Sequence, residues 1–224
     1  MAITPQSLSL THLVREPEVA PPAGDKPPLM LLLHGVGSHE HDLFDLAPHL
    51  DPRFLVLSLR APITLRPGAF AWYPVDFTPQ GIVSDETQAE ASRQKILAFI
   101  DEAVEAYGAD PARVFLGGFS QGAIMSLFAA LTAPERVAGV VPMSGRLLPD
   151  AWHNRAPDDA LRGLPVFAVH GTYDNVLPVA LGREIRDKLL TLPLDFAYRE
   201  YPMAHEISQA SLSDIADWLT ARLG

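Results

Sequence analysis

The sequence predicts an α/β fold in which helices cover both faces of a mostly parallel sheet. Short apolar runs, the pattern of strands buried on both faces, recur at residues 29–33, 54–59, 114–116, 137–141 and 165–169. Helical apolar patterns lie between several of these runs, which is the alternation expected of a parallel sheet. Since 224 residues with 48% hydrophobic content suffice for one core, we expect residues 1–224 to form a single domain.

The first part of the chain is expected to hold an edge strand, loops and a short helix. Residues 7–14 alternate apolar and polar side chains as an edge strand does, and residues 16–28 carry five prolines and should form a loop. Residues 42–50 space leucines at helical intervals around Pro48 and predict a short helix or two turns. Residues 61–83 lack clear periodicity but are rich in aromatic side chains, which favours a wall over a groove or a loop that caps the core.

The clearest predicted helix begins at residue 84 or 85 and extends to about residue 107. Gly108 stands where a C-terminal glycine belongs, and Pro111 prevents the helix from continuing. The remaining expected elements are a connection over residues 144–163, a helix over 179–190, a strand over 195–201 and a closing amphipathic helix over 208–223.

Composition excludes several classes of protein. Asp and Glu outnumber Lys and Arg by 27 to 17, and the basic residues do not cluster, so neither nucleic acid nor an anionic membrane is an expected partner. The absence of cysteine excludes disulfides, a thiolate nucleophile and cysteine-based metal centres. The N-terminal residues resemble no secretory leader and no run approaches membrane-spanning length, so we expect a cytoplasmic protein without stable membrane insertion.

A Gly-x-Ser-x-Gly motif, Gly118 to Gly122, stands between a predicted strand and a predicted helix. In such a turn the glycines permit a strained backbone that lifts the serine hydroxyl above the sheet edge, where Ser120 could act as a nucleophile. The alternative is that Ser120 only caps the helix that follows. A base and an acid at the same sheet edge would decide for the nucleophile.

A nucleophilic serine needs a base to accept its proton and an acid to orient that base. In the chain order Ser, Asp or Glu, His, the best base is His205, which follows the last predicted strand, and the best acid is Asp174, a few residues past a buried strand. His153 precedes Asp174 and so breaks the order. His34 and His170 lie beside glycines at strand ends, where we expect hydrogen-bonded structural histidines.

The oxyanion of a tetrahedral intermediate requires two further hydrogen-bond donors. We expect the backbone N–H of Gln121, which follows the nucleophile, and that of Val36, which Gly35 and Gly37 should expose. Residues 39–42, His-Glu-His-Asp, could suggest metal ligands, but no third histidine follows at a matching spacing. We therefore expect a polar loop there and no metal site.

Five segments carry a family resemblance: LLLHGVGSHEHDL, RAPITLRPGAFAWYPVDF, VFLGGFSQGAIMSL, VFAVHGTYDNVLPV and YPMAHEIS. In this order and spacing they resemble the phospholipase/carboxylesterase family of α/β-hydrolases, which includes acyl-protein thioesterases and small bacterial carboxylesterases. The resemblance implies an α/β-hydrolase fold with no large lid and no cofactor. Carried over by residue, it implies Ser120 as nucleophile, Asp174 as acid, His205 as base, and the amides of Val36 and Gln121 as the oxyanion hole.

The chain departs from the family pattern at Ala204, where the family often has glycine before its histidine, but this change removes no catalytic group. Substrate contacts are expected from the aromatic segment, residues 61–83, and from the connection over residues 144–163. The candidates are Phe70, Trp72, Tyr73 and Leu147.

The expected activity is hydrolysis of a small-molecule acyl ester, carboxylic or thio-, through an acyl-enzyme intermediate. A lysophospholipase or an acyl-protein thioesterase is the alternative within enzymes, and a non-catalytic ligand-binding protein on a hydrolase scaffold is the alternative outside them. Apolar surface in the aromatic segment or along the edge strand would also allow a homodimer.

Overall fold

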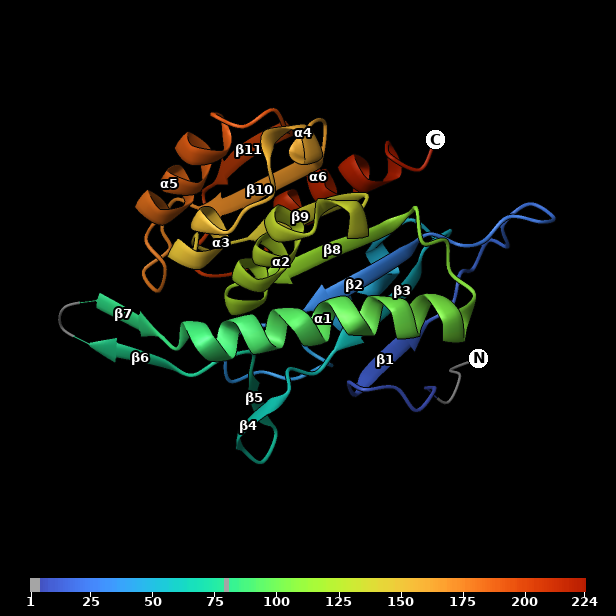
Figure 1. Ribbon diagram of the computed structural model, residues 1–224, viewed down its shortest axis with the longest axis horizontal. Coiled ribbons are helices and arrows are strands. Elements are labelled where there is room, and N and C mark those ends of the chain that lie inside the picture. Colours follow the sequence, from blue (N-terminus) through green and yellow to red (C-terminus); the bar gives the residue numbers. More distant parts are fainter. Residues whose placement is uncertain (1–4, 79–80) are drawn as a thin grey trace.

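A seven-stranded sheet forms the centre of the computed structural model, which describes residues 5–78 and 81–224 (Figure 1). The strand order is β1-β3-β2-β8-β9-β10-β11; β1 is antiparallel to β3, and every other neighbouring pair is parallel. This arrangement confirms the predicted fold class. The strands are β1 (His12–Arg15), β2 (Leu29–Leu33), β3 (Leu55–Leu59), β8 (Val114–Phe119), β9 (Gly139–Met143), β10 (Pro165–Gly171) and β11 (Asp195–Tyr201).

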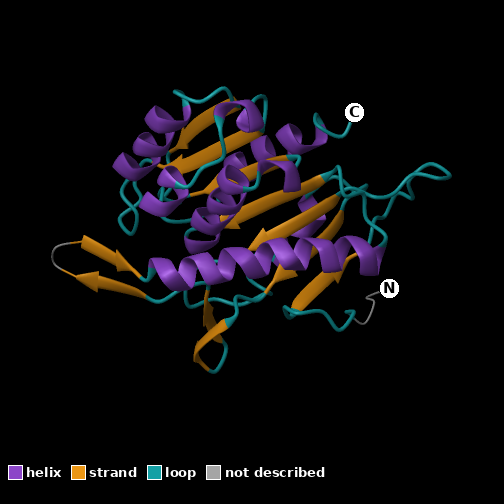
Figure 2. Cartoon of the chain, in the orientation of Figure 1, coloured by secondary structure: helices purple, strands orange, loops and turns teal. Residues whose placement is uncertain are grey.

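Helices lie on both faces of this sheet (Figure 2). They are the α-helices α1 (Glu86–Tyr107), α2 (Gln121–Thr132), α3 (Pro149–His153), α4 (Asp158–Leu161), α5 (Val179–Leu189) and α6 (Gln209–Thr220), and the 3₁₀ helices η1 (Phe44–His49) and η2 (Pro134–Arg136). Within the described part of the chain, no helix combines the length and the apolar character that crossing a membrane requires.

Strand β2 shows how the sequence produces two cores. Its five residues are all buried, and successive side chains point to opposite faces of the sheet. Leu31 belongs to the core that contains Phe99 of α1 and Leu127 of α2. Leu32 belongs to the core on the other face, with Ile215 of α6. A continuous apolar run is therefore the correct signature of a strand covered on both sides.

Helix α1 begins and ends where its sequence signals predict. The carboxylate of Asp85 accepts a hydrogen bond from the Gln88 N–H at 3.0 Å and so caps the N-terminus. At the other end Gly108 adopts φ 65°, a left-handed conformation that glycine enters without steric cost.

Three sequence expectations need correction. The N-terminal strand begins at His12 rather than at residue 7, because Leu10 enters the core without pairing with the sheet. Strand β9 starts two residues later than expected, since the Val137 N–H bonds to Pro134 in the turn of η2.

Residues 61–83 are not irregular, which is the third correction. They include the hairpin β4 (Ile63–Arg66) and β5 (Ala69–Ala71), and β6 (Val75–Thr78) pairs with β7 (Gly81–Ser84). Strands this short present too few residues for a periodic signal. The second hairpin projects beyond the start of α1 (Figure 1).

The turn from β8 into α2 is packed backbone against backbone. A Cβ on Gly118 would lie 2.2 Å from the Gly122 carbonyl oxygen, and a Cβ on Gly122 would lie 1.8 Å from the Leu33 carbonyl oxygen at the end of β2. Only glycine fits at either position, because neither neighbour is a side chain that could move aside. The two glycines of the motif thus hold α2 against the end of β2.

We predict that Gly122→Ala lowers the free energy of unfolding by about 3 kcal/mol or more, since the added methyl must push two backbone segments apart. Urea denaturation measures the change. Gly163→Ala is the matched control: this exposed glycine has φ 73° and open space around its Cβ position, so only backbone strain of about 1–2 kcal/mol is added. Equal losses in the two variants would contradict the packing argument.

Candidate active site

Ser120 lies at the carboxyl end of β8 with φ 55° and ψ −115°, a conformation that non-glycine residues rarely adopt. Its N–H bonds to the Met143 carbonyl at 2.9 Å, and its carbonyl accepts the Ile124 N–H at 3.1 Å in the first turn of α2. Such strain costs on the order of 1–3 kcal/mol and persists only where the surroundings enforce it. Here the neighbouring strand and helix enforce it.

His205 lies in the loop after β11 and faces Ser120. Its Nε2 is 3.0 Å from the Ser120 Oγ, and its Nδ1 is 2.7 Å from Oδ2 of Asp174. A carboxylate can only accept, so Nδ1 carries the proton and Nε2 is left to accept one from the serine hydroxyl. The sequence order Ser120, Asp174, His205 is therefore matched by three side chains within hydrogen-bond distance.

The loop that carries His205 approaches the sheet closely because of Gly171. A Cβ at Gly171 would lie 2.3 Å from the Ala204 carbonyl oxygen. The methyl group of Ala204 itself is exposed. The departure from the family pattern at this position therefore disturbs no packing.

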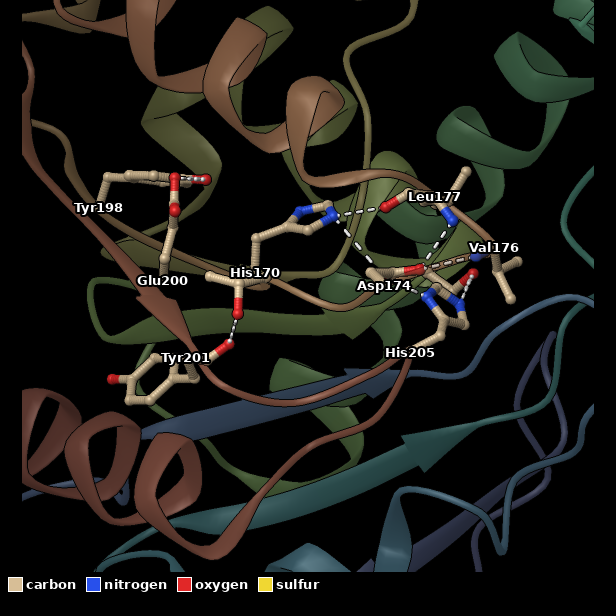
Figure 3. A network of polar contacts seen from close by, with 10 residues as sticks. His170, Asp174, Val176, Leu177, Tyr198, Glu200, Tyr201 and His205 are labelled. Atoms are coloured by element: carbon tan, nitrogen blue, oxygen red, sulfur yellow. Dashed lines mark hydrogen bonds and ion pairs between the residues drawn. The ribbon is translucent and has the colours of Figure 1, made fainter.

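Asp174 is held on both of its oxygens. Its side chain is fully buried, and Oδ1 accepts the N–H groups of Val176 at 2.9 Å and Leu177 at 2.8 Å, while Oδ2 faces His205 (Figure 3). Hydrogen bonds to the charged form of a carboxylate stabilise it. The orientation of Asp174 toward His205 is thus fixed by its own loop.

The two histidines expected to be structural do have structural contacts. His170 donates from Nε2 to the Leu177 carbonyl at 2.7 Å and thereby holds the loop of Asp174 (Figure 3). His34 donates from Nδ1 to the Gly35 carbonyl at 2.7 Å and accepts the Ala61 N–H at 3.0 Å. Burial lowers the pKa of both rings, which keeps them neutral.

Val36 and Gln121 border the same cavity as Ser120 and His205. Neither backbone N–H donates to another group of the described residues, so both are free to bind an oxyanion. The expected oxyanion donors are therefore brought to one place, one from the loop after β2 and one from the first residue of α2.

The loop after β2 is fixed by Phe70 of β5. Gly37 donates its N–H to the Phe70 carbonyl at 2.8 Å, and Ser38 accepts the Phe70 N–H at 2.9 Å. The aromatic ring lies under the guanidinium of Arg60, 4.5 Å from its centre. Phe70, predicted to contact substrate, instead borders a separate pocket and supports the loop of Val36.

An ion pair holds the same loop from its other end. Arg60 donates two hydrogen bonds to Glu40, at 2.6 Å and 2.5 Å, and the Glu40 side chain is only 5% exposed. The Arg60 guanidinium lowers the pKa of Glu40 to about 2. Because Glu40 is paired with Arg60, residues 39–42 form part of a loop that this ion pair fixes. Among the described residues, no three His, Asp or Glu side chains are grouped so that they could hold a metal ion.

Gln121 connects the turn at Ser120 to the aromatic segment, residues 61–83. Its side-chain oxygen accepts the Trp72 N–H at 2.8 Å, and its side-chain nitrogen donates to the Tyr73 carbonyl at 2.7 Å. Ser92 of α1 bonds to the Trp72 carbonyl, and the Trp72 indole N–H bonds to the His34 carbonyl at 3.0 Å. The backbone after β5 is consequently fixed to Gln121, and the Trp72 indole ties it to the loop of Val36 as well.

The cavity at Ser120 has a volume of about 210 Å³. Of the predicted substrate contacts, Tyr73 borders it, whereas Trp72 is fully buried and Leu147 is packed in the core, so neither is among the described lining residues. Burial raises the pKa of Tyr73 to about 12, so its hydroxyl stays protonated. Sequence reasoning missed several lining residues, among them Val75, Ile124 and Val176, which lie in the family segments, and Arg146, which lies in none of them.

The topology and the turn at Ser120 define an α/β-hydrolase fold, and comparisons with known proteins agree. The profile of the Phospholipase/Carboxylesterase family matches residues 14–223. The chain therefore belongs to this family.

Similar proteins align with this chain over most of their length. It is 28% identical to acyl-protein thioesterase 1 of Emericella nidulans, over 92% of this chain and 94% of that protein. Among solved structures, esterase PE8 superposes with a TM-score of 0.83 at 26% identity, covering 96% of this chain and 99% of that one. The Bacillus cereus carboxylesterase gives a TM-score of 0.80 at 21% identity, covering 96% of each chain.

We predict that Glu40→Gln destabilises the protein at pH 7 by about 1–3 kcal/mol, since it leaves Arg60 without its charged partner. The pKa of Glu40 falls on folding from an ordinary 4.5 to about 2, so its contribution is present above pH 4.5 and is lost as the pH falls toward 2. The difference between wild type and Glu40→Gln, measured by urea denaturation, should therefore shrink between pH 5 and pH 3.

Asp159→Asn serves as the control for this prediction. Its carboxylate pairs with Arg162 on the surface and is 94% exposed, so we expect no measurable change in stability at either pH. A wild-type to Glu40→Gln difference that stays constant with pH would show that the ion pair does not hold the loop.

Proposed function

We propose that this protein is a carboxylesterase that cleaves small acyl esters with Ser120 as nucleophile, His205 as base and Asp174 as the acid that orients the base. The observation that carries the proposal is the continuous hydrogen-bonded path from Ser120 Oγ through both ring nitrogens of His205 to Asp174 Oδ2, with lengths of 3.0 Å and 2.7 Å. Ser120, at one end of this path, borders a cavity that could hold an acyl group.

Acylation begins when Ser120 Oγ attacks the ester carbonyl while His205 Nε2 takes the hydroxyl proton. The carbonyl oxygen becomes an oxyanion, which the N–H groups of Val36 and Gln121 stabilise. Asp174 holds the imidazolium and keeps the proton of Nδ1 in place. His205 then returns its proton to the leaving alcohol, and the acyl group stays on Ser120.

Deacylation repeats these steps with water as the nucleophile. His205 takes a proton from water, the hydroxide attacks the acyl carbonyl, and a second oxyanion forms at the same two donors. When this intermediate collapses, the proton returns to Ser120 Oγ and the carboxylic acid is released. The free enzyme is regenerated.

The size of the cavity favours a short acyl group. At about 210 Å³ it is smaller than the roughly 300–1,000 Å³ typical of sites that enclose drug-sized ligands. Its walls include the apolar side chains of Val75, Ile124 and Leu177. A short hydrocarbon chain would be bound there mainly by the hydrophobic effect.

Thioester hydrolysis is the second candidate, because the relative from Emericella nidulans is named an acyl-protein thioesterase. The same nucleophile and oxyanion hole would serve a thioester. A ligand-binding protein without activity is disfavoured, since binding alone would not require a strained serine in line with a histidine and an aspartate.

The cellular location and the oligomeric state are part of this proposal. We propose that the protein acts in the cytoplasm, and that a homodimer, if formed, uses an edge of the sheet. The exposed edges are β1 on one side and β11 on the other. Apolar residues such as Leu65 of β4 are also exposed, at 50%.

A chain-length profile of p-nitrophenyl esters and matched thioesters tests the proposed activity. We expect the highest kcat/KM for acyl groups of two to six carbons, and a fall of about 10⁴-fold or more in Ser120→Ala because the covalent intermediate can no longer form. Ser213→Ala, which alters an exposed serine of α6, is the control for a serine substitution as such. Activity that survives in Ser120→Ala would refute the mechanism, and a preference confined to long acyl chains or to thioesters would displace the short-ester substrate.

A further inference from the structure

The cavity beside Ser120 carries one feature that ester hydrolysis alone does not need. Arg146 is the only Lys or Arg among the described residues that line it. The residue follows β9 in a segment that crosses the first turn of α2, where a Cβ on Gly145 would lie 2.8 Å from the Cβ of Ala123. The guanidinium is thus brought to the wall of the cavity by the helix that begins directly after the nucleophile.

Arg146 is held in place without being neutralised. Its Nη2 donates to the Ser84 hydroxyl of β7 at 2.6 Å, which uses one of the five N–H donors of a guanidinium. No carboxylate of the described residues lies within 4.0 Å of it. Most other arginines of the described chain do have such a partner.

Glu86, at the start of α1, interacts electrostatically with Arg146. Burial and the adjacent Asp150 carboxyl raise the pKa of Glu86, and the charge of Arg146 opposes that rise. Glu86 therefore shares the surroundings of Arg146 but forms no ion pair with it. A half-buried cation that lacks a carboxylate partner among the described residues is suited to bind a carboxylate of a ligand.

Asp42 is the one carboxylate on the cavity wall among the described residues, so the cavity carries a negative charge as well as the positive charge of Arg146. It also borders a neighbouring pocket with Phe119 and His205, whereas Arg146 is tied to Ser84. An anionic group would be repelled near Asp42 and attracted near Arg146. Since Arg146 does not border that second pocket, the two opposite charges would orient a bound ester.

We infer that Arg146 is a specificity-determining residue that selects esters bearing a carboxylate or a similar oxyanion a few atoms from the scissile carbonyl. This inference rests on the proposed esterase function and names its substrate class. A guanidinium can bind a carboxylate through two parallel hydrogen bonds, which fixes orientation as well as charge.

The net charge of −10 does not oppose this selection at close range. Interactions between exposed charges are largely screened beyond about 8–10 Å at ordinary salt concentrations, whereas a contact pair in a partly enclosed cavity is screened much less. The local charge of Arg146 would therefore decide which esters bind.

Two matched pairs of esters test the inference and locate the anion. Monoethyl succinate and ethyl succinamate differ only in a carboxylate or an amide on the acyl side, and 4-carboxyphenyl acetate and 4-carbamoylphenyl acetate differ in the same way on the leaving group. We expect wild type to prefer the anionic member by about tenfold or more in kcat/KM in at least one pair. Arg146→Met, which keeps the length of the side chain but removes its charge, should reduce that preference at least tenfold.

Arg146→Lys should retain part of the preference, since it keeps the charge and loses the paired donors. Arg162→Met, at an exposed site paired with Asp159, is the control for loss of an arginine. A wild type that hydrolyses both members equally, or a ratio unchanged in Arg146→Met, would overturn the inference and leave the esterase proposal standing. A wild type that hydrolyses none of these esters nor the p-nitrophenyl series would overturn both.

Discussion

The close crossing of three backbone segments is the constraint on which the site depends. The carbonyl of Leu33 at the end of β2, Gly118 at the end of β8 and Gly122 in the first turn of α2 approach so closely that no Cβ fits between them. This contact forces the turn that gives Ser120 its positive φ, and it sets the loop after β2 beside the start of α2. Ser120, the proposed nucleophile, and both expected oxyanion donors therefore take their positions from one packing contact. The hydrolase chemistry that we propose follows from that geometry more than from any single side chain.

A second layer of contacts fixes the loop that would bind the oxyanion. The Glu40–Arg60 ion pair, the backbone pairing of Phe70 with Gly37 and Ser38, and the side chain of Gln121 all act on backbone rather than on substrate. Preorganised donors stabilise a developing charge most effectively, because they need not reorient during the reaction. The aromatic segment thus contributes mainly by holding the site, and only Tyr73 among its three predicted contacts reaches the cavity wall.

The fold class and the buried parallel strands could be predicted from the sequence, because a strand covered on both faces is a continuous apolar run, as in β2. The short strands of the two hairpins could not. The sequence also allowed Ser120, Asp174 and His205 to be chosen, since each follows a strand end and the structure brings them together. The placement of Phe70, Trp72 and Leu147 could not be predicted, because the direction of a side chain in a short hairpin or connection depends on tertiary packing. Arg146 was not predicted for a related reason: the role that we propose for it depends on the absence of a carboxylate partner among the described residues, which only the folded structure shows.

The most direct test of the central claim is to trap the acyl-enzyme. Wild-type protein would be mixed with excess p-nitrophenyl butyrate, quenched in acid within milliseconds to seconds, digested and analysed by peptide mass spectrometry. We expect a butyryl adduct at Ser120, on the peptide that contains this residue, and its disappearance as the substrate is exhausted. Turnover without any adduct at Ser120, or with an adduct on a different residue, would contradict the proposed mechanism.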